Sequence, residues 1–146
     1  MKLSRAPVVV LAFALATSVQ AEEVAFEALM VPQEQMRLEF QDGSGHFVLM
    51  VRREGSAEGS GPLAGTAVTE HGWHDIQPGI GGDPQGYLSF DAGDGMAYLK
   101  WTVRAVFVPG PEGTPVLLDN GFWEVAGATG SLEGLMGAGT KHIRPA

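Results

Sequence analysis

Short runs of alternating apolar and polar residues, bounded by glycine, proline and aspartate, fill the chain after residue 21. Alternation with a period of two is typical of β-strands that bury one face. The longest alternating run, 96–108, separates two sets: Ala97, Leu99, Trp101, Val103, Ala105 and Phe107 on one face, and Tyr98, Lys100, Thr102 and Arg104 on the other. The pattern therefore predicts a core-facing side. The residues that we expect to be buried are Phe40, Leu99, Trp101, Val103 and Phe107.

Turn sequences indicate where the strands pair. Asp42-Gly-Ser-Gly45 separates two alternating runs, and so does Asp91-Ala-Gly-Asp-Gly95. Glycine supplies positive φ in such turns, and aspartate binds backbone donors. Further runs lie at 24–31, 63–69 and 140–143, and 116–125 carries one or two short strands, which makes about eight strands in all. This predicts an all-β domain, a single closed antiparallel barrel or, as an alternative, a sandwich.

The first 21 residues resemble an export signal. Lys2 and Arg5 precede an uncharged, mostly apolar run, 6–19, that is too short to span about 30 Å of hydrocarbon as a helix. We expect a signal peptide at 1–21, cleaved after Ala21, followed by a β-barrel domain at 22–146. The alternative is an uncleaved membrane anchor. The prediction implies a periplasmic or extracellular protein without stable membrane insertion after cleavage.

Composition removes several classes of function. The 146 residues include no cysteine, which excludes disulfides, thiolate zinc sites and thiol nucleophiles. The formal net charge is −8, so nucleic acid is not an expected partner. No cofactor is predicted, and a homo-oligomer stays open.

The densest polar cluster is Glu70-His-Gly-Trp-His-Asp75. On a regular strand His71 and Trp73 share one face and His74 points the opposite way. Three interpretations compete: a divalent-metal site of His71, His74 and Asp75, a catalytic histidine oriented by a carboxylate, or a solvated rim segment with Trp73 filling the core. We favour the rim, at one end of the barrel, and assign no metal site.

A second group of candidates lies on the long strand 96–108, where Tyr98, Lys100 and Arg104 share one face. They meet an anionic ligand if that face lines a barrel lumen, and water if it is the outer face. No nucleophile elbow supports a catalytic serine, so no catalytic residue is assigned. The full set of candidate ligand-binding residues is His71, Trp73, His74, Asp75, Tyr98, Lys100 and Arg104.

The glycine-rich tail carries a resemblance to a known group of proteins. Trp123 to Gly139 resembles the G-T-G-x-[FY]-x-G-x-x-G-x-G signature of allene oxide cyclases, dirigent proteins and related secreted bacterial proteins, and the Asp91–Gly95 turn is similar to one that often precedes it. The resemblance implies an eight-stranded antiparallel barrel. It carries over no catalytic residue.

Three functions follow as hypotheses. The first is an exported barrel that binds or guides a small apolar or aromatic molecule in its lumen. The second is a cyclase or isomerase of the allene oxide cyclase-like type. The third is a non-enzymatic structural or interaction protein with a packed barrel. We favour binding.

Overall fold

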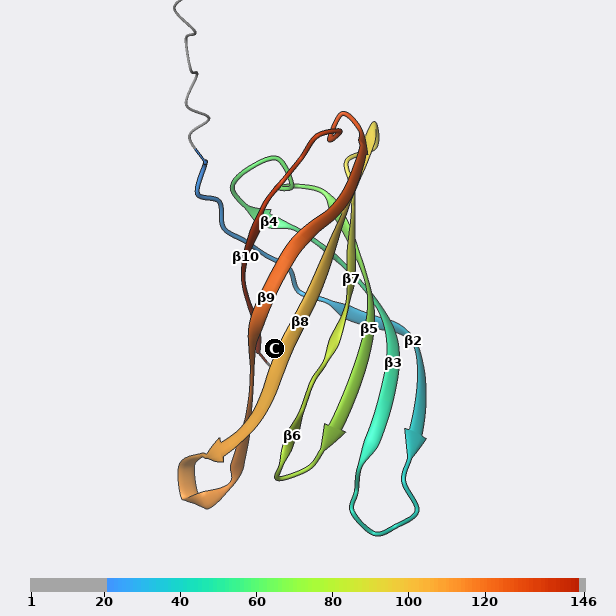
Figure 1. The fold of residues 1–146 in the computed structure, drawn as a ribbon, viewed down its shortest axis with the longest axis vertical. Helices are drawn as coiled ribbons and strands as arrows, with labels where there is room; N and C mark the ends of the chain where they lie inside the picture. The colour runs from blue at the N-terminus through green and yellow to red at the C-terminus, as the bar shows by residue number, and fades with distance from the viewer. Residues whose placement is uncertain (1–20, 145–146) are drawn as a thin grey trace, which may run out of the picture.

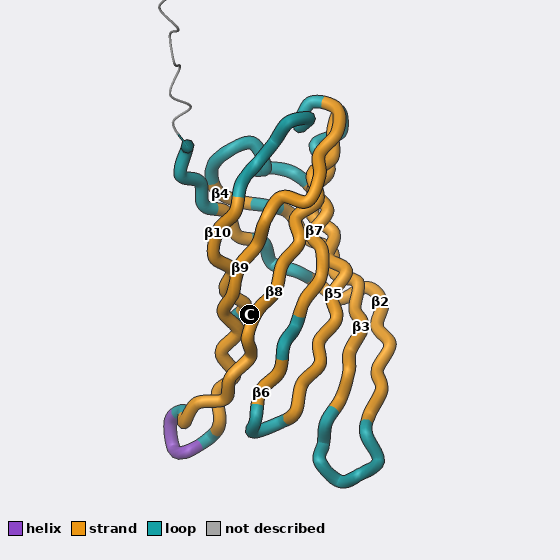
Figure 2. The backbone as a smooth tube through the Cα atoms, viewed as in Figure 1, coloured by secondary structure: helices purple, strands orange, loops and turns teal. Residues whose placement is uncertain are grey.

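Ten strands form most of the computed structural model, which describes residues 21–144 (Figures 1 and 2). The strands are β1 Phe26–Glu27, β2 Val31–Glu39, β3 Phe47–Ser56, β4 Glu58–Gly59, β5 Ala67–Gln77, β6 Gly81–Gly82, β7 Gln85–Asp91, β8 Gly95–Pro109, β9 Pro115–Gly130 and β10 Ala138–Ile143. Within this range no helix is long and apolar enough to cross a membrane. The predicted signal peptide lies outside the described residues, apart from Ala21.

Eight of the strands make one antiparallel sheet, and the prediction of an all-β fold is confirmed. The order across the sheet is β10-β9-β8-β6-β5-β3-β2, and β7 pairs with both β5 and β8. β1 and β4 pair separately. Figure 1 shows the β2–β3, β5–β6 and β8–β9 connections pointing toward the same end of the molecule.

Alternation along β8 separates a buried face from an exposed one, as predicted. Leu99, Trp101 and Val103 are buried, with Trp101 only 1% exposed. Phe107 is half-buried rather than buried. The expectation for Phe40 is wrong, because its ring is 39% exposed. Phe40 follows β2, a strand whose nine residues are all exposed, so this end of the sheet provides little apolar cover.

The core forms where chain segments fold over the buried face of β8 and β7. Phe90 and Leu99 are fully buried there, and Phe26 of β1 packs edge-on against Phe90 with 5.4 Å between ring centroids. Leu132, from the glycine-rich tail, is buried in the same cluster, while Met136 is exposed. A T-shaped aromatic pair contributes about 1 kcal/mol beyond the free energy gained by burying its surface.

The sheet ends at two unjoined strands. The predicted antiparallel sheet is confirmed. Between residues 21 and 144, however, no backbone ladder links β2 to β10, so hydrogen bonds between strands do not close the sheet into a barrel. The chemistry of β2 gives the reason. Its inward-facing residues are polar or charged, and they offer no apolar face for β10 to cover; they are Gln35, Arg37 and Glu39.

The segment 116–125 belongs to one long strand rather than one or two short ones. β9 passes through Asn120-Gly121 without a turn, and a Cβ on Gly121 would lie 2.0 Å from the Thr102 carbonyl oxygen. Glycine here permits close pairing with β8 instead of a reversal. The reversal comes later, where Gly130 and Gly134 adopt positive φ between β9 and β10.

Replacing Trp101 with alanine should lower the free energy of unfolding by about 3–5 kcal/mol, because a large buried aromatic side chain is lost. Chemical denaturation measures the change. Tyr98→Ala, on the exposed face of the same strand, is the matched control and should cost about 1 kcal/mol or less. Equal losses for the two variants would contradict the assignment of the faces.

Candidate functional site

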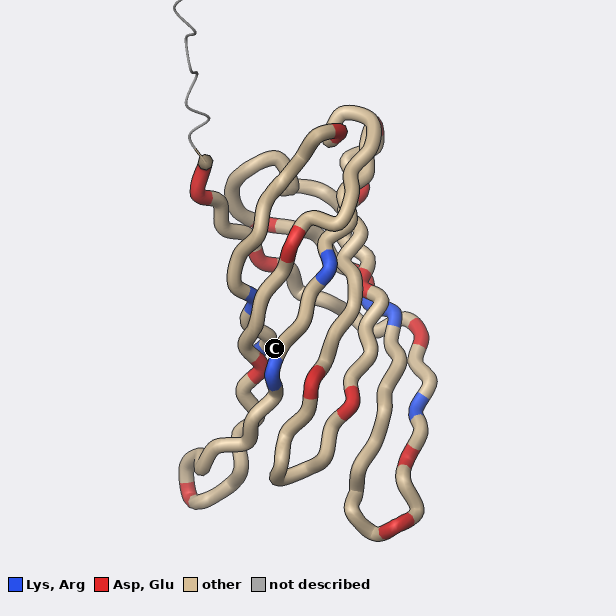
Figure 3. Tube along the Cα trace, in the orientation of Figure 1, with Lys and Arg blue, Asp and Glu red and all other residues tan. Residues whose placement is uncertain are grey.

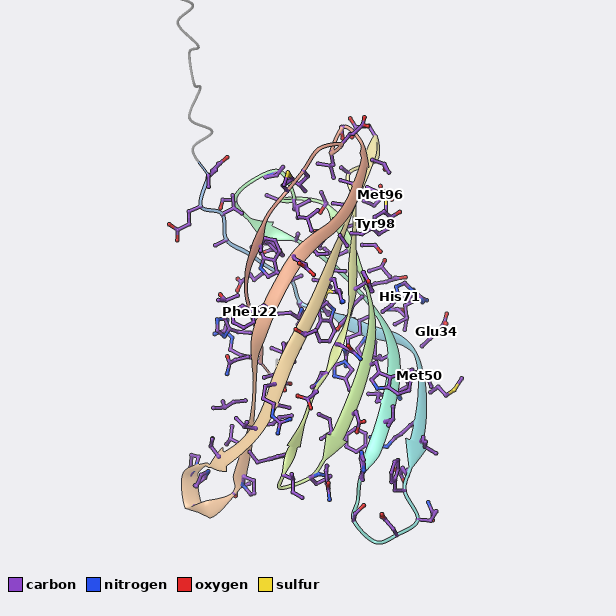
Figure 4. The ribbon with its side chains drawn as sticks, viewed as in Figure 1. Glu34, Met50, His71, Met96, Tyr98 and Phe122 are labelled. Carbon is purple, nitrogen blue, oxygen red and sulfur yellow. The ribbon has the colours of Figure 1, made fainter. Side chains whose placement is uncertain are left out.

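Two rows of side chains cross the outer face of the sheet, the face opposite Trp101. Direct pairing places His71 of β5 between Arg52 of β3 and Tyr87 of β7. The first row, from β2 to β8, is Glu34, Arg52, His71, Tyr87 and Lys100. The second is Met36, Met50, Trp73 and Gln85. Figure 4 shows Glu34, Met50 and His71 together on the β2–β3–β5 side of the sheet.

Between these rows lies a groove of about 520 Å³. The paired backbones of Gly72 and Gly86 form its floor together with Val51. One wall is polar and the other is mostly apolar, because the two rows differ in chemistry. Of the predicted candidates, His71, Trp73 and Lys100 line this groove. The structure therefore brings together three of the seven residues.

The two cations of the polar wall have different surroundings. Arg52 donates to Glu34 Oε1 at 3.0 Å and also pairs with Glu54; these hydrogen bonds raise the pKa of Arg52 above its ordinary value. The side chains of Lys100, His71 and Tyr87 make no hydrogen bond or ion pair with any residue in 21–144. Lys100, His71 and the Tyr87 hydroxyl are thus the polar groups of the wall that remain available to a ligand.

Trp73 does not fill the core, contrary to the expectation, since 42% of its side chain is exposed. The rim placement is wrong as well. Trp73 pairs with Met50 on one side and Gln85 on the other, well within the sheet. β5 stays regular through Gly72, so odd-numbered residues face outward and even-numbered ones inward.

The remaining outer candidates lie elsewhere on the same face. Arg104 donates two hydrogen bonds of 2.9 Å to the carboxylate of Asp83, beside a second groove of about 330 Å³ that includes Phe122 and shares Gln85 with the first. Tyr98 lies outside both grooves and is exposed. Figure 4 shows Tyr98 and Phe122 apart from the labelled groove residues.

Asp75 interacts with His46, and not with His71 or His74. His46 Nε2 lies 2.5 Å from Asp75 Oδ1, and the His46 ring stacks on Phe40 with centroids 4.0 Å apart. His71 and His74 project from opposite faces of β5, so they do not share a metal with Asp75. In the described part of the chain, no group of three or more histidine or acidic residues is placed to hold a metal ion.

His74 belongs to a buried polar cluster on the inner face. Arg53 Nη1 donates to Glu70 Oε2 at 3.0 Å and lies 3.2 Å from His74 Nε2. Because Arg53 is always a donor, His74 Nε2 is the acceptor and Nδ1 carries the proton. Burial, aided by the charge of Arg53, lowers the pKa of His74 to about 4. His74 is therefore neutral at pH 7.

Lys141 reaches the same cluster from β10. Its Nζ lies 4.7 Å from the centroid of the Trp101 ring, and burial lowers the pKa of Lys141, although Glu70 acts in the opposite direction. Among residues 21–144, two buried side-chain atoms lack a hydrogen-bond partner, Trp101 Nε1 and Asp119 Oδ1. Burial raises the pKa of Asp119.

Sequence reasoning missed most of this inner cluster. Glu70 was noticed only as part of the polar segment, and Arg53, Lys141 and Asp119 were not singled out. The available clue was the alternation of Val68 and Ile76, both apolar, which places Glu70 and His74 on the same buried face of β5. Pairing of Arg53 with Glu70 depends on strand register, which the sequence alone leaves open.

Comparisons with models of protein families, with curated proteins and with solved structures find no match to this chain. They do not bear on the resemblance of Trp123–Gly139 to allene oxide cyclases and dirigent proteins, which stays a prediction.

The buried neutral His74 makes stability depend on pH. Between pH 6.5, the ordinary histidine value, and about 4, the unfolded chain binds a proton that the folded protein does not. Stability should therefore fall as the pH falls through this interval, by about 3 kcal/mol from this residue. Denaturant titrations of the wild type and His74→Gln measure it.

His71→Gln provides the matched control, since His71 is exposed on the same strand. The control should keep the wild-type slope of unfolding free energy against pH, and His74→Gln should flatten it. Identical slopes for His74→Gln and the wild type would show that His74 does not titrate as described.

Proposed function

We propose that this protein binds a small, flat aromatic or apolar molecule carrying an anionic group, and that the ligand lies in the outer groove rather than in a lumen. The observation that carries the proposal is the pairing of an apolar row with a row that ends in an unpaired cation. Trp73 and Met50 face the groove on one side, and Lys100 and His71 face it on the other. Pockets with apolar walls and a few polar groups are typical of small-molecule sites.

The contacts expected of each residue follow from its chemistry. The Trp73 indole offers an apolar face on which an aromatic ring stacks, and the Met50 thioether is well suited to an aromatic edge. Lys100 binds the anionic group by charge, and Tyr87, which lies between Lys100 and His71, contributes a hydroxyl donor. Arg52 stays bound to Glu34 and shapes the end of the groove.

The proposed activity is reversible binding without a covalent step. The Gly72–Gly86 backbone holds its N–H and C=O groups within the sheet, and the groove residues are positioned by five neighbouring strands, so the site is preorganised. Export to the periplasm or the exterior of the cell remains part of the proposal, on the sequence of residues 1–21 alone. Figure 3 shows cations and acidic residues interspersed over the strands, consistent with a local rather than a general attraction for anions.

Binding at the inner face is the second candidate, because this face would line the lumen of a closed barrel. Lys141 over Trp101, together with the unpartnered Trp101 Nε1, offers a cation and a donor to a ligand there. The outer groove is preferred because it is an open space of sufficient volume, whereas Trp101 is almost completely buried.

A pair of probes tests the outer site. 2-Naphthoate should bind and change the fluorescence of Trp73, and uncharged 2-naphthamide should bind about tenfold more weakly because it lacks the charge for Lys100. Trp73→Ala should weaken 2-naphthoate by about tenfold or more. Lys100→Met should remove the preference for 2-naphthoate over 2-naphthamide. Calorimetric titration gives each affinity.

Phe122→Ala is the matched control, an exposed aromatic residue of the same face outside the first groove. It should leave both affinities unchanged. Binding that survives Trp73→Ala and Lys100→Met but is lost in Lys141→Met would move the site to the inner face. Absence of binding by either probe to the wild type would overturn the proposed ligand chemistry.

A further inference from the structure

The free edge of β2 is the feature of the fold that the binding site leaves unexplained. β2 ends the sheet, and all nine of its residues are exposed. On the outer face it presents Met36 and Leu38, which are 66% and 57% exposed, and Phe40 follows directly. Long exposed strand edges with apolar side chains are uncommon, because their unpaired N–H and C=O groups attract another strand.

Hydrogen bonding within the β2–β3 hairpin fixes which groups face the open edge. Phe40 N–H donates to the His46 carbonyl at 2.9 Å, in the same register that continues through Leu38–Val48 and Met36–Met50. Even-numbered residues of β2 thus direct their backbone groups toward β3. The direction of the backbone N–H and C=O groups alternates along an antiparallel strand. Odd-numbered residues of β2, Arg37 and Glu39 among them, therefore direct these groups toward the open edge.

We propose that the β2 edge binds the β2 edge of a second copy of this chain, antiparallel, with Leu38 on the two-fold axis. In this register Arg37 of each copy lies opposite Glu39 of the other, and the odd-numbered residues exchange the hydrogen bonds. Leu38 then meets Leu38, and Met36 meets Phe40 of the second copy. Cross-strand pairs of opposite charge and of apolar side chains both stabilise a sheet.

The charges select this register. Moving the axis to Arg37 or to Glu39 places like charges directly opposite each other, and moving it to Met36 leaves Arg37 opposite Gln35. They also select the partner. Arg37 and Glu39 form an ion pair on the inward face of an edge strand, 2.8 Å apart, and such charges disfavour an arbitrary apolar strand. A second copy presents the complementary pair, and the interface is isologous.

Such a dimer also affects the outer groove. This effect on the groove rests on the proposed function, whereas the dimer itself does not. The groove extends to Met36 on β2. In the paired sheet Phe40 of the second copy lies beside Met36 on the same outer face, because opposite residues of paired strands share a face. The second copy therefore adds an aromatic wall to the end of the groove that one chain leaves open.

Sedimentation equilibrium of the unliganded protein over a range of concentrations tests the proposal. The wild type should dimerise. Arg37→Glu places like charges opposite each other twice and should weaken the dimer by about tenfold or more. The exchange of both residues, Arg37→Glu with Glu39→Arg, should restore it. Arg104→Glu makes the same change in net charge far from β2 in the sheet order and should have no effect.

Three outcomes would overturn the proposal. The first is a wild type that stays monomeric. A barrel closed by β2 and β10 within one chain would give this result, and so would a β2 edge that binds only extended peptides. The second is a dimer that Arg37→Glu leaves unchanged. The third is a charge exchange that folds, as judged by its thermal melt, but fails to restore the dimer. Probe binding is measured separately, so failure of the groove leaves this result intact.

Discussion

Two glycines that face each other across neighbouring strands allow the inner surface of this sheet to take its form. Gly72 of β5 pairs with Gly86 of β7. A Cβ on Gly86 would lie 2.2 Å from the His71 carbonyl oxygen and 3.0 Å from Trp101 Cζ2, so the Trp101 ring occupies the space that a side chain at 86 would need. On the opposite surface the same backbone pair is the floor of the outer groove.

The glycine pair also makes room for the buried charges. A Cβ on Gly72 would lie 2.9 Å from His74 Nε2 and 3.1 Å from Glu70 Oε1. Arg53, Glu70 and His74 can therefore bind one another beside an otherwise apolar core. Removing one member of such a buried network costs more than the network contributes, because the remaining groups lose their partners. The inner cluster thus ties β3, β5 and β10 to the central Trp101 without forming the groove itself.

The sequence predicts the elements where alternation and turn residues agree. The β8 face with Leu99 and Trp101, and the turn at Asp91–Gly95, follow from period and turn chemistry alone. The environments of Trp73 and Phe40 do not, because burial depends on what covers a strand, and no apolar segment within 21–144 buries these two side chains. A tryptophan on an alternating strand looks the same in sequence whether its face is buried or exposed.

The sequence predicted three residues of the candidate site, His71, Trp73 and Lys100, but neither their neighbours in the groove nor its geometry. Lys100 lies far from His71 and Trp73 in the chain, and only the β5–β7–β8 register brings the three to one groove. Asp75 and Arg104 turned out to be held by His46 and Asp83, partners set by long-range pairing. Side-chain chemistry identifies the groups that bind a ligand, and strand register decides which of them meet.

The packing of Trp101 requires the Gly72–Gly86 pair, and the unfolding free energy of Gly86→Ala measures this requirement. Gly127→Ala is the matched comparison, since a Cβ there has no neighbour within 4 Å. We expect a loss of about 1–3 kcal/mol for Gly86→Ala, with a change in Trp101 fluorescence, and about 0.5 kcal/mol or less for Gly127→Ala. Equal stability of the two variants would contradict it.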